Sequence, residues 1–157
     1  MEKKDLPRGI RNNNPLNIRI SSNQWVGKVS NNTDGIFEQF VSLVYGLRAA
    51  MRNIKTHIDR RRKAKKKTTI CDLIHIWAPA SDHNNESAYC AAIQKQTTFP
   101  PNYVIDYKNK NHFCMLIHAM VIVECGQAVD MVRIENAYTL AFGPDSNYGL
   151  PYAKDGI

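Results

Sequence analysis

RGIRNNNPLNIR, residues Arg8–Arg19, is the most distinctive stretch of this chain. Its three consecutive asparagines, Asn12–Asn14, stand directly before Pro15. Asparagine favours turns, and the residue before a proline avoids helical backbone angles. The stretch therefore predicts an irregular N-terminal region over residues 1–35, with short extended pieces that form at most a small β-hairpin.

Downstream of this region, apolar residues recur at helical spacing. Capping residues and prolines bound the predicted helices. These helices run from Ser42 to about Asp59, from Thr68 or Thr69 to Pro79, from Asn84 or Asn85 past Ile93, from Phe113 to Cys125, and from Met131 to Phe142. The fourth helix is apolar on all sides, which is typical of a buried helix. The expected fold class is mainly α.

The length of 157 residues and the 43% hydrophobic content suit one globular domain. A chain of this size buries roughly 70% of its unfolded surface without needing cross-links. Neither an internal repeat nor a shift in composition marks a second domain. We expect a single domain over residues 1–157, with a flexible leader at residues 1–7 and an irregular tail at residues 145–157.

The formal net charge of +7 belongs to one segment. Seven of the eight residues from 60 to 67 are basic, and the rest of the chain is formally neutral. They are Arg60, Arg61, Arg62, Lys63, Lys65, Lys66 and Lys67. Such a run is either a solvated helix end or a surface that attracts a polyanion such as nucleic acid, an anionic membrane or a wall polymer.

The four cysteines, Cys71, Cys90, Cys114 and Cys125, include no C-x-x-C pair and lack metal-ligand spacing. We expect buried free thiols, no metal and no cofactor, which favours synthesis in a reducing cytoplasm. The N-terminus has no apolar signal region, and no apolar run is long enough to span a membrane. A periplasmic target would then be reached through a phage particle or secretion machinery.

Several separated motifs together resemble one protein family. The stretch Arg8–Arg19 is followed by Trp25-Val26-Gly27, then by Phe37 to Phe40, then by Tyr45-Gly46-Leu47-Arg48-Ala49 and Trp77-Ala78-Pro79. This order is similar to that of small phage and prophage proteins that open with an RGIRNNNPGNIR-like sequence and are often described as virion structural proteins. Leu16 stands where those relatives have glycine, which indicates a turn that needs no positive φ at this position.

A looser resemblance connects the same motifs to lysozyme-like glucosaminidases, which cut peptidoglycan glycan strands. The stretches Asn14–Arg19, Trp25–Gly27 and Phe37–Ser42 resemble motifs of those enzymes in order and spacing. The resemblance implies a lysozyme-like helical domain. In those enzymes the catalytic glutamate ends a buried helix before the first motif, whereas here only Glu2 precedes it, in a charged leader.

Glycoside cleavage requires a carboxylic acid that stays protonated near neutral pH, and hence one that is partly desolvated. Glu124 ends the most apolar predicted helix, in a sequence that resembles the A-x-x-x-E-S-G helix end of lysozyme-like enzymes. We therefore hypothesise that Glu124 is the acid and that the order of elements is circularly permuted. The alternative is a Glu124 that points outward or pairs with an arginine such as Arg48.

Asp34, in the stretch Asn31–Gly35, is the candidate for the second catalytic carboxylate, although a plain turn aspartate is the alternative. Glu38 is expected to be solvated, Asp82 to be a turn or cap residue, and Glu86 to support a helix start. His118 is expected to be a core histidine rather than a ligand.

Asparagine and arginine side chains hydrogen-bond sugar hydroxyl and acetamido groups, and aromatic rings pack against sugar rings; the alternative for the aromatic residues is core packing. The candidate substrate-binding residues are Asn13, Asn14, Asn17, Arg19, Trp25, Trp77 and Tyr89. The leading interpretation is a peptidoglycan glycan-strand hydrolase or lytic enzyme of phage origin. The alternatives are a non-catalytic virion or tail component, and a nucleic-acid-binding protein that uses residues 60–67.

Overall fold

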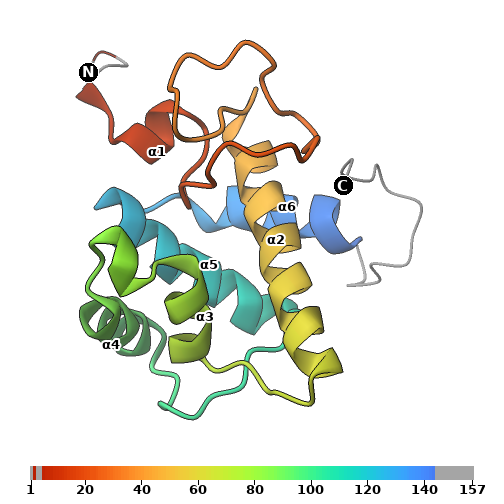
Figure 1. Ribbon diagram of the computed structural model, residues 1–157, viewed down its shortest axis with the longest axis vertical. Coiled ribbons are helices and arrows are strands. Elements are labelled where there is room, and N and C mark those ends of the chain that lie inside the picture. The colour runs from red at the N-terminus through yellow and green to blue at the C-terminus, as the bar shows by residue number, and fades with distance from the viewer. Residues whose placement is uncertain (1, 3–4, 144–157) are drawn as a thin grey trace.

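A computed structural model describes residue 2 and residues 5–143, and the predicted tail at residues 145–157 lies outside this range. The described part is mainly α, as predicted (Figure 1). Its elements are α1 (Arg8–Arg11), α2 (Leu43–Lys63), α3 (Ile70–Trp77), the 3₁₀ turn η2 (Ala80–Asp82), α4 (Glu86–Thr97), α5 (Lys110–Cys125) and α6 (Met131–Phe142).

The long helix α2 runs from the N-terminal loops to the opposite end of the molecule (Figure 1). It begins after Ser42, as predicted, but the Ser42 side chain makes no capping hydrogen bond. It continues beyond the predicted end at Asp59 to Lys63. Lysine and arginine are good helix formers, and positive charge is favourable at a helix C-terminus, so the first half of the basic run stays helical.

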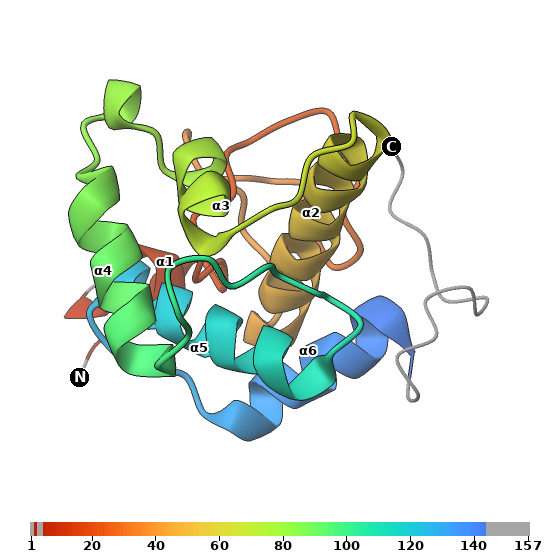
Figure 2. The ribbon, with the colours of Figure 1, turned by 90° about the horizontal axis from the view of Figure 1, so that it is seen from below.

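Side-chain caps start the next two helices where the sequence predicts them. Thr69 and Asp72 form a capping box at the start of α3, and Asn85 accepts a hydrogen bond from the Ala88 backbone at the start of α4. The segment between these helices, predicted as a plain loop, contains the 3₁₀ turn η2. Helices α3 and α4 lie against each other (Figure 2).

A disulfide joins α3 to α4, which corrects the expectation of four free thiols. Cys71 and Cys90 are 5.4 Å apart at their Cα atoms and are bonded, whereas Cys114 and Cys125 are free and buried. The pairing depends on the packing of two helices and leaves no local spacing signal, so the sequence could not indicate it. The cysteine content consequently no longer argues for a reducing compartment.

Helix α5 is the centre of the helical region, and it contacts α1, α4 and α6. Phe113, Ile117 and Met120 are almost completely buried, as an all-apolar helix requires. Gly126 caps α5 in the left-handed conformation, with φ of 70°. Helix α6 has the predicted bounds and packs against both α2 and α5.

The N-terminal segment from residue 12 to residue 42 contains no helix and is held mainly by individual hydrogen bonds. Isolated antiparallel bridges join Arg19 to Phe37 and Lys28 to Phe40. The expectation of no helix in this region is wrong for residues 8–11, where the short α1 forms before the asparagine run begins. Asn13 and Asn17 have positive φ, whereas Leu16 does not, as its side chain predicts.

Two glycines from the recognised motifs allow this segment to contact α2 closely. A Cβ atom at Gly46 would lie 1.8 Å from the carbonyl oxygen of Asn13, and one at Gly27, where φ is +80°, would lie 2.5 Å from the Tyr45 ring. The Asn13 backbone can approach Gly46, and the Tyr45 ring can approach Gly27, this closely only because glycine has no side chain. The separated motifs are therefore parts of one contact between the N-terminal segment and α2.

No helix among the described residues is long and apolar enough to cross a lipid bilayer.

Candidate active site

A pocket of about 310 Å³ lies where the N-terminal segment meets α2 and α3. This volume falls within the range of small-molecule sites. Its lining combines aromatic and amide side chains with one carboxylate: Asn17, Ile18, Arg19, Ser21, Asn23, Trp25, Asn53, His57, Ile76, Trp77, Pro79 and Asp82. Four of the predicted substrate-binding residues, Asn17, Arg19, Trp25 and Trp77, therefore line one pocket.

A hydrogen bond to a residue that is distant in the sequence holds Trp77 at this pocket. Its indole Nε1 donates a hydrogen bond of 3.1 Å to the carbonyl oxygen of Leu16, next to Asn17. The indole ring is thus fixed against the turn of the opening motif. Arg19 lies at the same pocket, where its guanidinium is 3.8 Å from the exposed carboxylate of Asp82.

Glu124 lies in the last turn of α5 and is partly buried. Burial raises the pKa of its carboxyl to about 7, and the nearby side chain of Asn17 acts in the opposite direction. Among the described residues no cation pairs with Glu124, so the expected alternative of an Arg48 ion pair does not occur. Asn17 also lines the pocket, so the Glu124 carboxyl lies next to a residue of the pocket wall.

Two of the residues that line the pocket carry a buried polar atom without a hydrogen-bond partner. Among the described side chains, the buried nitrogen and oxygen atoms that lack a hydrogen bond are Asn17 Oδ1, Trp25 Nε1, Glu38 Oε1 and Tyr89 Oη. Asn17 and Trp25 line the pocket. Burial raises the pKa of Tyr89, and the nearby charge of Glu124 raises it further. Unsatisfied buried polar groups are rare and frequently mark functional sites.

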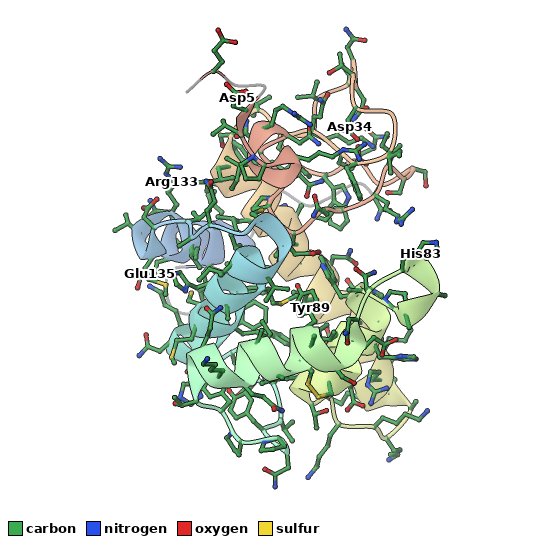
Figure 3. The ribbon with its side chains drawn as sticks, turned by 90° about the vertical axis from the view of Figure 1, so that its left-hand side faces the viewer. Asp5, Asp34, His83, Tyr89, Arg133 and Glu135 are labelled. Atoms are coloured by element: carbon green, nitrogen blue, oxygen red, sulfur yellow. A yellow bond between two sulfur atoms is a disulfide. The ribbon has the colours of Figure 1, made fainter. Side chains whose placement is uncertain are left out.

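Asp34 does not lie at this pocket, which contradicts its expected role as the second catalytic carboxylate. Arg8 donates to both of its carboxylate oxygens at 2.8 Å, and Asn12 and the Phe37 backbone also donate to it. The hydrogen bonds from Arg8 are the main cause of its lowered pKa. Figure 3 shows Asp34 among the N-terminal loops and Tyr89 in the helical region. Asp34 therefore stabilises a loop.

Asn13 and Asn14 are also expected to bind substrate, but their side-chain amides form hydrogen bonds with backbone groups instead. The Asn13 side chain donates to the carbonyl of Phe40. The fully buried Asn14 donates to the carbonyls of Ile18 and Glu38 and accepts from the Ile18 backbone N–H. Of the predicted asparagines, only Asn17 lies in the pocket.

Glu38 is completely buried and not solvated, contrary to expectation. Its carboxylate pairs with Lys28 at 2.9 Å and accepts from the Ser21 backbone N–H. Glu86 lies in the first turn of α4, as predicted, and pairs with His75.

Sequence reasoning missed four pocket residues, Ser21, Asn23, Asn53 and His57. Asn53 and His57 are four positions apart on α2, so they share one face of the helix. Because α2 is amphipathic and carries many other polar side chains, this pair gives no distinctive signal in the sequence. Burial and the charge of Arg60 lower the pKa of His57, which favours its neutral form.

No protein-family model matches the chain. The chain is similar to a phage protein, which agrees with the class that its motifs indicate. Protein P5 of Pseudoalteromonas phage PM2 is 33% identical over 125 residues, a match that covers 78% of this chain and 73% of the relative. The chain therefore belongs to the family of that Protein P5 and is a phage-related protein.

Proposed function

We propose that this protein cleaves the glycan strands of peptidoglycan, with Glu124 as the general acid. The observation that carries the proposal is the proximity of the buried Glu124 carboxyl to the side chain of Asn17. It connects a desolvated carboxyl at the end of α5 to the turn of the opening motif and to the aromatic pocket. The sequence resemblance to lysozyme-like enzymes predicts this meeting of a glutamate with that turn.

The raised pKa suits Glu124 for proton donation. A carboxyl with a pKa of about 7 is substantially protonated at neutral pH, and its proton can pass to the glycosidic oxygen. The bond between that oxygen and the anomeric carbon then breaks, which leaves positive charge on the sugar. Water or a hydroxyl group of the sugar attacks this carbon, and the attacking group returns a proton to the Glu124 carboxylate.

The rest of the pocket fits the binding of a sugar. The partly exposed Trp77 is available for contact with the apolar face of a sugar ring, the buried Trp25 forms part of the pocket wall, and Asn23 and Asn53 offer amide donors and acceptors. Since Asp34 is fully engaged by Arg8 and Asn12, Asp82 is the better candidate for a second carboxylate. Its exposed position and its distance of 3.8 Å from Arg19 leave it available to a substrate.

The test compares the wild type with Glu124→Gln and with the control Glu135→Gln on purified peptidoglycan. Glu135 lies on α6 and is not among the residues that line the pocket. We expect Glu124→Gln to release soluble muropeptides at least about 100-fold more slowly, because the general acid is lost. The control should stay close to the wild type. Wild-type activity should also fall as the pH rises through about 7, as Glu124 loses its proton.

Two results would oppose this proposal. A wild-type protein that releases no muropeptides at any pH would favour the alternative of a non-catalytic virion component. A fully active Glu124→Gln variant would exclude Glu124 as the acid while leaving the activity itself established.

A further inference from the structure

The basic run at residues 60–67 lies at the end of α2 opposite the N-terminal loops (Figure 1). Two of its residues have internal partners. Arg61 pairs with Asp72 at 3.3 Å and also donates to Thr68 and to the Lys67 carbonyl. Arg62 is 3.7 Å from Asp59. These two arginines therefore stabilise the connection between α2 and α3.

The other five basic residues have no such role. Among the described residues, none of their side chains forms an ion pair or a hydrogen bond, and all five are exposed. They are Arg60, Lys63, Lys65, Lys66 and Lys67. Their charges equal five of the seven positive charges by which the chain exceeds neutrality.

Helix stability does not account for this cluster. Cations are favourable within the last turn of a helix, which explains Arg60 and Lys63. Residues 65–67 lie beyond that turn, and Lys65 has φ of 62°, where glycine or asparagine is usual. Neighbouring like charges also repel one another. The interaction with the helix C-terminus therefore accounts for Arg60 and Lys63 but not for the three lysines at residues 65–67.

The arrangement suits a ligand that carries closely spaced negative charges. Arg60 and Lys63 are one turn apart, about 4.5 Å along the helix axis. Lys65 has a left-handed backbone conformation directly after α2 ends, and Lys66 and Lys67, which follow it, are exposed. Duplex DNA presents a negative charge about every 1.7 Å of its axis, so several phosphates lie within reach of one such cluster.

A membrane surface fits the cluster less well. Peripheral membrane helices combine cations with an exposed apolar face. The apolar residues of α2 near this end, Ile54 and Ile58, are buried in the core. The large hydrophobic residues that are exposed lie outside residues 60–67.

We propose that Arg60, Lys63 and residues 65–67 bind the phosphate backbone of double-stranded nucleic acid without sequence preference. Five cations without internal partners, gathered on one end of a helix, are the electrostatic footprint of such binding. This site is separate from the pocket at Asn17 and does not depend on the proposed glycosidase activity.

Fluorescence anisotropy of a labelled short DNA duplex, measured over a series of salt concentrations, tests the proposal. If five phosphates are neutralised, the slope of log K against log salt is about −4.5, and a fourfold rise in salt weakens binding about 500-fold. The variant Lys63→Gln/Lys65→Gln/Lys66→Gln should reduce the slope by about 3. The matched control Lys63→Arg/Lys65→Arg/Lys66→Arg keeps the charge and should retain binding. Circular dichroism checks that both variants fold like the wild type.

Three outcomes would overturn the proposal. The first is absence of DNA binding by the wild type at low salt. The second is a salt slope that the three glutamine substitutions leave unchanged. The third is stronger binding to vesicles that contain anionic lipid than to the DNA duplex, which would assign the cluster to a membrane surface.

Discussion

The N-terminal segment and the helical region of this protein are stabilised in different ways. Residues 12–42 form no helix, and polar contacts such as the amide of Asn14 and the pair of Arg8 with Asp34 hold them in place. The helical region from α2 to α6 supplies most of the apolar core, to which the N-terminal segment adds Leu16, Ile18, Trp25 and Phe40. The proposed site lies at the junction of the two regions, where the N-terminal segment supplies amide and aromatic groups and burial at the end of α5 desolvates Glu124.

The largest expected effect on stability comes from a substitution that forces the N-terminal segment and α2 apart. Gly46→Ala would place a methyl group 1.8 Å from the Asn13 carbonyl oxygen, so that α2 or the asparagine turn must move. We expect a loss of about 3 kcal/mol in the free energy of unfolding, which is the upper range for overpacking. Urea denaturation measures this loss of stability.

Thr56→Ala, on an exposed face of the same helix, is the control and should change stability by less than about 0.5 kcal/mol. A fully stable Gly46→Ala protein would contradict the close contact.

A somewhat smaller effect is expected from the polar interior of the N-terminal segment. Asn14→Ala removes three hydrogen bonds and takes the side-chain donor away from the Glu38 carbonyl, while the Ile18 carbonyl keeps only the Glu38 backbone N–H. We expect a loss of about 2–3 kcal/mol, comparable to Leu73→Ala in the apolar core. Hydrogen exchange distinguishes the two variants. Asn14→Ala should expose amides of residues 18–40 first, whereas Leu73→Ala should expose those of α3 and its neighbours. Identical exchange patterns would mean that the two regions unfold as one.

The smallest expected effect on stability comes from removing the ion pair between Arg8 and Asp34, and this effect depends on pH. The pKa of Asp34 is lower in the folded protein than the value of about 4 in an unfolded chain. The pair therefore stabilises the fold above that unfolded pKa, and the stabilisation is lost as the pH falls through the folded pKa. At neutral pH, Asp34→Asn should lower the melting temperature by about 2–4 °C. The two proteins should converge in strong acid, whereas the control Asp5→Asn should melt like the wild type throughout. A difference that persists in strong acid would show that the effect is not due to the carboxylate charge.

Local sequence signals predicted most of the helical framework. The capping residues Thr69 and Asn85 and the terminating Gly126 act through neighbouring backbone groups, so their effect can be derived without the tertiary structure. The end of α2 was predicted too early because the basic run was expected to break the helix. The short α1 was missed because the asparagines that follow it were taken to exclude helix from the whole segment.

The candidate site was predicted only in part. Glu124 was singled out because one acidic residue at the end of an apolar helix is unusual, and its pKa is indeed raised by burial. Asp34 was misassigned because its partner Arg8 lies 26 positions away, a distance over which sequence gives no contact information. His57 and Asn53 were missed because their helix appeared to be a core element.

The sequence by itself determined that this chain is mainly helical, that the asparagine-rich part of its opening motif is irregular, and that it carries one strongly basic segment. These properties follow from backbone preferences, hydrophobic period and formal charge, which act over a few residues. Only the tertiary structure decided that Cys71 bonds to Cys90, that Asn14 supports backbone while Asn17 lines a pocket, and that Glu124 meets that asparagine. Desolvation and pairing depend on groups brought together from distant positions, because burial is a property of packing and not of local sequence.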